Sequence, residues 1–195
     1  MSHIGIFGGT FDPIHNGHLI TISNVLEQRK LEKIIFVPCY ISPLKIGQYS
    51  ISAEHRLAMI KTAIKNHTKF DCSAFEIERG GVSYTIDTLE YFKTLYDSID
   101  LIVGYDNIAV FDKWKNPDKI FSLANVIVMK RKIDTTPLTE NTFMKKAVYV
   151  DTPVIDISSS IIRERLLKNL PIDFLVPEKV KDYIMSNKLY QPKNL

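Results

Sequence analysis

The sequence has few cysteines and no long apolar run, and each absence excludes a class of protein. Cys39 and Cys72 lie far apart and form no CxxC pair, which excludes a disulfide framework and a cysteine-rich zinc site. The longest apolar run, residues 34–41, contains Pro38 and is far shorter than the roughly 20 residues that span a bilayer. Residues 1–7 include neither the basic nor the long apolar stretch of a signal peptide. We therefore expect a cytoplasmic protein without a membrane partner.

A strong excess of one charge is also missing, since 25 Lys and Arg residues stand against 22 Asp and Glu residues. The only dense basic clusters are residues 130–132 and 145–146. Duplex nucleic acids are usually bound by a larger one-sided basic stripe, so we expect no nucleic-acid partner. The charge agrees with a small anionic ligand such as a nucleotide, and equally with scattered solubilising lysines.

The composition and the pattern of apolar residues predict one α/β domain that covers residues 1–195. Hydrophobic residues make up 45% and charged residues 24%, as in ordinary globular domains. Short β-branched runs alternate with longer segments of helical period, which is typical of βαβ units on a parallel sheet. The predicted strands are residues 3–7, 33–37, 70–75, 100–103, 125–129 and 147–150.

Between these strands, apolar residues three or four positions apart predict helices that pack on the sheet. They are Leu19, Ile22 and Leu26, then Leu57, Ile60 and Ile64, then Leu89, Phe92 and Tyr96. Pro117 and Pro177 are placed to begin helices, and Pro171 follows a helix end at Asn169. Residues 132–146 lack periodicity and predict a mobile loop. The expected fold is a doubly wound, Rossmann-like parallel sheet with a helical C-terminal part.

Gly8, Gly9 and Thr10 follow the first predicted strand, at the edge of a doubly wound sheet where ligands bind. The glycines let the backbone approach a phosphate closely, and Thr10 offers a hydroxyl donor. The spacing fits neither GxGxxG nor GxxxxGK[ST], which disfavours a nicotinamide-dependent dehydrogenase and a P-loop kinase.

His15 and His18 can face the same side of a helix that begins near Asn16. The two rings, the free N–H groups and the helix dipole would then favour a triphosphate. A pair at this spacing can also be a surface accident. A zinc site is a further alternative, but no third ligand has a suitable spacing, since Asp12 lies before the turn.

A second candidate anion site lies in the C-terminal part, where Ser158, Ser159 and Ser160 precede a helical apolar pattern. We expect Ser160 to be the N-cap, which places Arg163 one turn inside the helix. Hydroxyls, helical N–H groups and a guanidinium can together bind phosphate oxygens. An ordinary capped helix with a solvated arginine is the alternative.

These two blocks resemble the signatures of one nucleotidyltransferase superfamily. The segment from Gly8 to His18 is similar to the signature GxFDPxHxGH, and residues 157–163 are similar to the signature ISSSxxR. The superfamily shares the HxGH part of the first signature with class I aminoacyl-tRNA synthetases. The resemblance implies catalytic roles for His15, His18 and Arg163. It also implies that ATP is bound by Gly8, Gly9, Thr10, His15, His18, Ser158, Ser159, Ser160 and Arg163.

The middle of the chain resembles the bacterial nicotinate-nucleotide adenylyltransferases. Residues 76–89 are similar to their SYTxxTL block, Gly104 to Asp106 and Lys113-Trp114 to their GxD block and KW pair, and residues 180–190 to their closing helix. The resemblance extends from Gly5 to Tyr190. It implies that ATP and nicotinate mononucleotide are joined to nicotinate adenine dinucleotide, with release of pyrophosphate, in NAD biosynthesis. Gly104 and Asp106 would then contact ATP, although a plain turn aspartate is the commoner explanation of Asp106.

The same resemblance assigns the acceptor site to Lys45, Ser83, Tyr84, Thr85 and Trp114. N–H groups at a helix start near Tyr84 and Thr85 could hold a carboxylate, and Trp114 could stack on a pyridine ring. Without the family, both aromatic residues would be read as packing residues. Leu44 stands where the family usually has histidine, while Lys45 keeps the positive charge for the acceptor's phosphate.

The expected mechanism is an in-line attack of the acceptor's 5′-phosphate on the α-phosphorus of ATP, without a covalent enzyme intermediate. Mg²⁺ is expected to accompany ATP, because phosphate oxygens recruit it and no carboxylate cage is visible. The alternatives are a pantetheine-phosphate adenylyltransferase and a non-catalytic nucleotide-binding protein. The sequence leaves open the choice between acid and amide acceptors and the oligomeric state, a homo-oligomer included.

Overall fold

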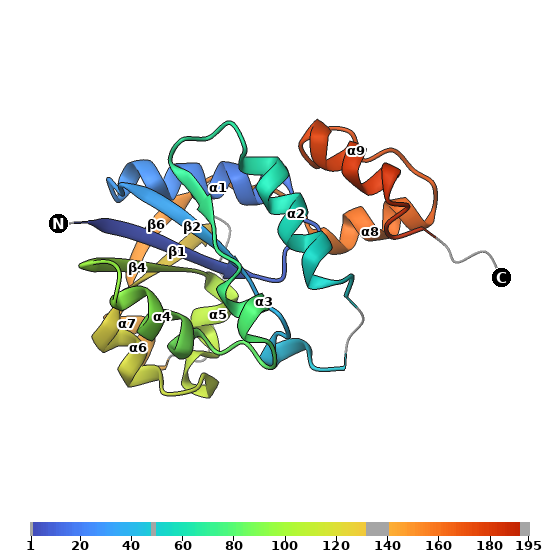
Figure 1. The fold of residues 1–195 in the computed structure, drawn as a ribbon. Coiled ribbons are helices and arrows are strands. Elements are labelled where there is room, and N and C mark those ends of the chain that lie inside the picture. Colours follow the sequence, from blue (N-terminus) through green and yellow to red (C-terminus); the bar gives the residue numbers. More distant parts are fainter. Residues whose placement is uncertain (1, 48–49, 132–140, 192–195) are drawn as a thin grey trace.

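The computed structural model describes residues 2–47, 50–131 and 141–191, which form a parallel sheet between two layers of helices (Figure 1). The sheet has six strands in the order β3-β2-β1-β4-β5-β6. This order is that of a doubly wound fold, in which the chain first winds outward from β1 and then returns to its other side. The strands are β1 (His3–Gly9), β2 (Lys33–Pro38), β3 (Phe70–Cys72), β4 (Ser98–Gly104), β5 (Asn125–Arg131) and β6 (Val148–Thr152).

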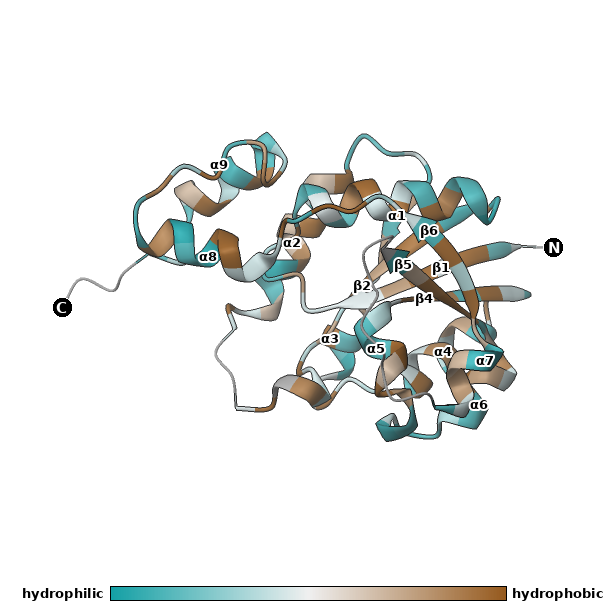
Figure 2. Cartoon of the chain, turned by 180° about the vertical axis from the view of Figure 1, so that it is seen from behind, coloured by the Kyte–Doolittle hydropathy of each residue, from teal (hydrophilic) through white to brown (hydrophobic). Residues whose placement is uncertain are grey.

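Helices cover both faces of this sheet. They are α1 (Asn16–Gln28), α2 (Ala53–Ile64), α3 (Phe75–Arg79), α4 (Thr85–Lys93), α5 (Tyr105–Ala109), α6 (Pro117–Leu123), α7 (Thr142–Lys146), α8 (Ser159–Leu167) and α9 (Glu178–Ser186), with short 3₁₀ turns η1 (Pro43–Lys45) and η2 (Phe111–Lys113). One buried cluster joins the sheet to α1, α2, α8 and α9, and the other joins it to α4, α5, α6 and α7. Figure 2 shows apolar residues concentrated along the strands and on the helix faces that meet them.

Alternation along the central strand explains why both faces are apolar. Ile4 and Ile6 belong to the cluster on one face, while Phe7 belongs to the cluster on the other. Gly5 faces the same cluster as Phe7, where a Cβ atom would lie 2.9 Å from the Cδ1 atoms of Leu31 and Ile102. A side chain at this position would therefore displace the ends of both neighbouring side chains.

The structure confirms the predicted fold class, and all six predicted strands are present. The third is shorter than expected because β3 ends at Cys72 and α3 begins at Phe75. Part of the predicted loop 132–146 is wrong, since Thr142–Lys146 is helix α7, capped by the Asn141 side chain. The rest of that prediction, residues 132–140, lies outside the described residues.

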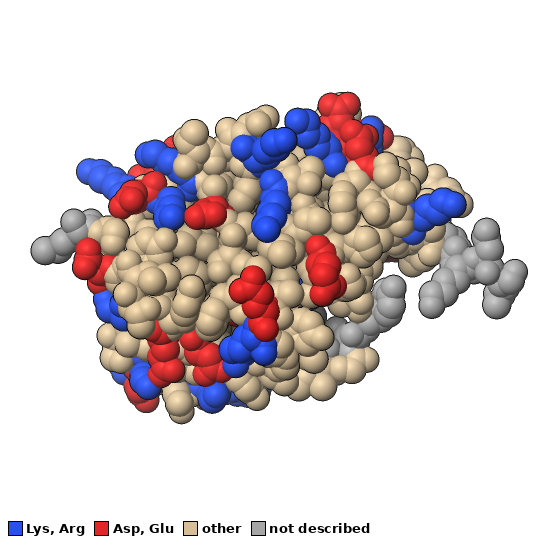
Figure 3. All heavy atoms as spheres, viewed as in Figure 1, with Lys and Arg blue, Asp and Glu red and all other residues tan. Residues whose placement is uncertain are grey.

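Two surface properties bear on the expected partners. On the face seen in Figure 3, basic and acidic side chains are interspersed, with no one-sided basic stripe on that face. None of the helices in the described part of the chain is long and apolar enough to cross a membrane.

Candidate active site

The carboxyl ends of β1, β2 and β4 surround a cavity of about 320 Å³. This position, at the reversal of strand order, is where doubly wound sheets bind ligands. The cavity is also lined by the beginning of α4 and by the segment after η2. Eight of the predicted site residues line it: Gly8, Gly9, Thr10, Ser83, Tyr84, Thr85, Gly104 and Trp114.

The two predicted histidines lie together at the start of α1. His15 is the N-cap, and its ring stacks on that of His18 with 3.6 Å between the ring centroids. Each ring accepts a main-chain N–H through Nδ1, because His18 N donates to His15 and His15 N donates to His18, both at 3.3 Å. An accepting Nδ1 carries no proton, so each ring carries a proton on Nε2.

Close packing explains the glycine between the histidines and the electrostatic state of His18. A Cβ atom on Gly17 would lie 3.0 Å from His15 Nδ1, so a side chain there would displace the ring. The rings of Phe7 and Phe11 contact His18 edge-on. Burial, and next the charge of His15, hold the pKa of His18 well below its usual value of 6.5. His18 is therefore neutral at pH 7 and donates one hydrogen bond.

The serine block lies beside the loop that precedes α1, although nearly the whole chain separates the two in sequence. The expected N-cap at Ser160 is wrong: Ser158 caps α8, and its Oγ accepts the N–H of Ile161 at 3.2 Å. Any of three consecutive serines could supply this bond, and the helix begins one residue after the first. Ser159 Oγ donates to the carbonyl of Pro13 at 2.9 Å, which attaches α8 to that loop.

Arg163 makes the second connection between these segments. Its guanidinium donates to the carbonyl of Asp12 at 2.6 Å and to Ser160 Oγ at 3.2 Å. The Asp12 carboxylate, buried at 5% exposure, accepts the Tyr190 hydroxyl at 2.6 Å. Burial and then the Asp12 charge raise the pKa of Tyr190. Sequence reasoning weighed Asp12 only as a zinc ligand and assigned no role to Tyr190.

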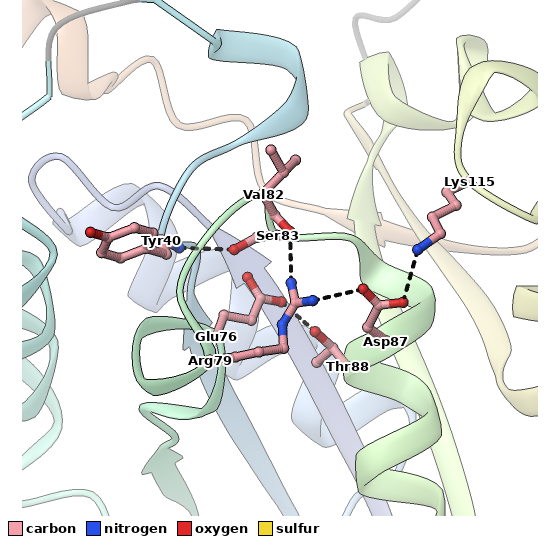
Figure 4. Close-up of polar contacts among 8 residues, drawn as sticks. All are labelled: Tyr40, Glu76, Arg79, Val82, Ser83, Asp87, Thr88 and Lys115. Carbon is pink, nitrogen blue, oxygen red and sulfur yellow. Dashed lines mark hydrogen bonds and ion pairs between the residues drawn. The ribbon is translucent and has the colours of Figure 1, made fainter.

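A hydrogen-bonded network supports the acceptor side of the cavity (Figure 4). Ser83 Oγ accepts the main-chain N–H of Tyr40 at 2.9 Å and donates to the Glu76 carboxylate. Thr88 Oγ1 donates to the same carboxylate at 2.5 Å. Burial raises the pKa of Glu76. The Ser83 hydroxyl therefore connects the loop after β2 to the start of α4.

The beginning of α4 and Trp114 form two of the walls of the cavity. Tyr84 is the N-cap of α4, and no side chain in the described part of the chain caps the helix. Trp114 stacks on Phe111 with centroids 4.6 Å apart, and its buried indole Nε1 has no hydrogen-bond partner among the described residues. Lys115 Nζ lies 4.5 Å from the centre of the Tyr84 ring, which joins the two walls by a cation–π contact.

Three further residues that the sequence singles out, Asp106, Leu44 and Lys45, are placed differently with respect to the cavity. Asp106 is exposed in the first turn of α5 and does not line the cavity. Leu44 does line it, with 59% of its surface exposed. Lys45 belongs to η1, but its side chain lies outside the described part of the chain.

Comparisons with known proteins agree over almost the whole chain. The model of the cytidylyltransferase-like family matches residues 6–165. The nicotinate-nucleotide adenylyltransferase of Bacillus subtilis is 40% identical, as is the probable nicotinate-nucleotide adenylyltransferase of Clostridium beijerinckii, with 98% of this chain and 100% of each relative covered. The Plasmodium falciparum nicotinic acid mononucleotide adenylyltransferase complexed with NaAD has the same fold, with a TM-score of 0.77 and 23% identity over 97% of this chain and 98% of that one.

Proposed function

This chain belongs to the nicotinate-nucleotide adenylyltransferases within the cytidylyltransferase-like family, and we propose that the histidine and serine blocks and the neighbouring cavity carry out its reaction. It joins ATP and nicotinate mononucleotide to nicotinate adenine dinucleotide and pyrophosphate, a step of NAD biosynthesis. The full-length relatives favour this activity over pantetheine-phosphate adenylyl transfer and over binding without catalysis. The observation that most supports the site assignment is the pair of histidines held in the Nε2-protonated form, with Arg163 bonded to the loop that precedes them.

The phosphate side neutralises charge during the transfer. The attacking 5′-phosphate is already an anion at neutral pH, so no side chain needs to remove a proton from it. His15 and His18 donate hydrogen bonds through Nε2 to the ATP phosphates, where charge develops on the departing pyrophosphate. Arg163 adds a permanent positive charge, and its bonds to Asp12 and Ser160 hold the guanidinium in place.

The acceptor side orients nicotinate mononucleotide. Main-chain N–H groups at the start of α4, around Tyr84 and Thr85, bind the carboxylate of the pyridine ring, where the positive end of the helix dipole favours an anion. Trp114 stacks on the ring. Lys45 neutralises the 5′-phosphate that attacks ATP.

Magnesium enters the reaction as part of the nucleotide substrate. In the described part of the chain, no group of three or more His, Cys, Asp or Glu residues is placed to hold a metal ion. The Asp12 carboxylate is itself engaged by Tyr190. ATP oxygens would therefore hold most of the coordination shell, and Mg²⁺ would reduce the repulsion between the two phosphate groups.

The acceptor assignment is testable with Trp114, because it is the sole tryptophan of the chain. Nicotinate mononucleotide should quench its fluorescence, and nicotinamide mononucleotide should need a higher concentration because it lacks the carboxylate. Quenching by both at equal concentrations would contradict the role of α4, and quenching by neither would contradict that of Trp114. The Trp114→Phe variant supplies the fluorescence background for this titration.

A further inference from the structure

Arg56 is a buried arginine whose hydrogen bonds all go to main-chain carbonyls. It lies in the first turns of α2 with 2% of its surface exposed. Its guanidinium donates to the carbonyl of Thr10 at 2.8 Å and to that of Tyr40 at 3.2 Å, and its Nε donates to that of Ile51 at 3.3 Å. No carboxylate in the described ranges forms an ion pair with it.

A buried charge without an ion pair is a cost to folding. Moving a charged group out of water is costly unless a partner of opposite charge compensates it, and an apolar side chain of similar size avoids that cost. Arg29 in the same chain follows the usual pattern, because its Nε bonds the buried Asp100 carboxylate at 2.7 Å. Arg56 forms no such ion pair within the described ranges, although it is more deeply buried than Arg29, and its charge acts at longer range on Glu54 and Tyr190.

The two main carbonyl partners of Arg56 belong to segments that meet at the cavity. Thr10 follows β1 and lines the cavity on the phosphate side. Tyr40 follows β2, and its N–H is held by Ser83, which lines the cavity on the acceptor side. The main chains of these segments are also joined directly, since Cys39 N donates to the carbonyl of Gly9 at 3.0 Å. The guanidinium therefore lies behind the junction of the two proposed substrate sites.

We propose that Arg56 is a positioning residue for the transfer reaction and that the substrate phosphates supply negative charge to a guanidinium that forms no ion pair within the described ranges. Its planar fork sets the spacing between the Thr10 and Tyr40 segments, and thereby between the two phosphates that must meet in line. Its charge acts on those phosphates through a protein interior that screens it less than water does. This inference rests on the proposed function and adds to it a residue that does not line the cavity.

Two substitutions separate the charge of Arg56 from its geometry. Arg56→Met removes the charge at similar length, and Arg56→Lys keeps the charge but loses the fork. The methionine variant should raise the KM values for ATP and nicotinate mononucleotide about tenfold and lose most of the rise in Tm that a non-hydrolysable ATP analogue gives the wild type. The lysine variant should keep both KM values within about threefold and lower kcat about tenfold.

Arg29→Met is the matched control, because it removes an arginine whose described ion pair is with Asp100. It should lower the Tm without changing KM or kcat below the unfolding transition. The proposal would be overturned if Arg56→Met kept the wild-type KM values and the wild-type rise in Tm with the ATP analogue. It would also be overturned if the KM values of Arg56→Lys rose as far as those of Arg56→Met. If Arg56→Met does not fold, the lysine variant decides: lowered kcat with nearly unchanged KM supports the proposal, and wild-type kinetics overturn it.

The test also separates this inference from the proposed function. Absence of pyrophosphate release by the wild type would refute the proposed function, whatever the variants do. In that case the rise in Tm that the ATP analogue causes can still be measured and compared between the wild type and Arg56→Met. Equal shifts, or no shift in the wild type, would overturn the role of Arg56.

Discussion

Replacement of His18 by alanine should lower kcat, because it removes one hydrogen-bond donor from the ATP phosphates. The Nδ1 atom of His18 accepts the N–H of His15, so Nε2 carries the proton that a phosphate oxygen can receive. A hydrogen bond to a charged group contributes about 1.5 to 3 kcal/mol. If it strengthens as charge develops on pyrophosphate, its loss lowers kcat by about 10-fold to 150-fold.

Two further substitutions test which ring atom matters. Glutamine can place its amide nitrogen close to the position of Nε2, so His18→Gln should recover much of the lost rate. Asparagine can replace the acceptor Nδ1 but not the outer donor, so His18→Asn should be as slow as alanine. The assay is steady-state pyrophosphate release at saturating substrates, and His67→Ala, which changes an exposed histidine beside Phe70, is the control. Unchanged turnover in His18→Ala, or equal rates for the glutamine and asparagine variants, would show that the Nε2 donor of His18 does not contribute to the transfer.

Three other outcomes follow from the same contacts. Because the pKa of His18 in the folded protein lies below 6.5, the unfolded chain takes up a proton at this residue first as the pH falls. Urea unfolding should therefore show a free energy of unfolding that declines below pH 6.5, and the decline should be smaller in His18→Gln. An identical decline in both proteins would contradict this. Trp114→Phe should raise the KM for nicotinate mononucleotide several-fold and leave that for ATP unchanged, and the reverse split in steady-state kinetics would exclude the stacking role. Tyr190→Phe removes a hydrogen bond to the Asp12 carboxylate, so urea unfolding should show a loss of about 1.5 to 3 kcal/mol, and wild-type stability would refute it.

The sequence predicted features that depend on local order along the chain. Strand and helix positions follow from apolar periodicity, and the site follows because Gly9 and Gly104 end parallel strands whose carboxyl ends meet at one edge. The start of α1 at Asn16 also follows locally, because a capping side chain acts within one turn. Family resemblance then selected the acceptor, which composition and periodicity do not identify.

Features that depend on long-range packing were not predictable in this way. The contact between Asp12 and Tyr190 joins residues separated by 178 positions. Arg56 looks like an ordinary polar residue of an amphipathic helix, and only the folded chain shows that carbonyls of two distant loops surround it. The N-cap at Ser158 rather than Ser160 depends on where α8 docks on Pro13, which three identical residues cannot indicate.

We claim that the chain transfers adenylyl from ATP to nicotinate mononucleotide, and pyrophosphate is the product whose release we would measure. The purified protein would receive ATP and Mg²⁺ together with nicotinate mononucleotide, nicotinamide mononucleotide or 4′-phosphopantetheine, each offered separately at equal concentration. We expect the highest kcat/KM with nicotinate mononucleotide and none with phosphopantetheine. Activity only with phosphopantetheine, or with none of the three acceptors, would contradict the claim.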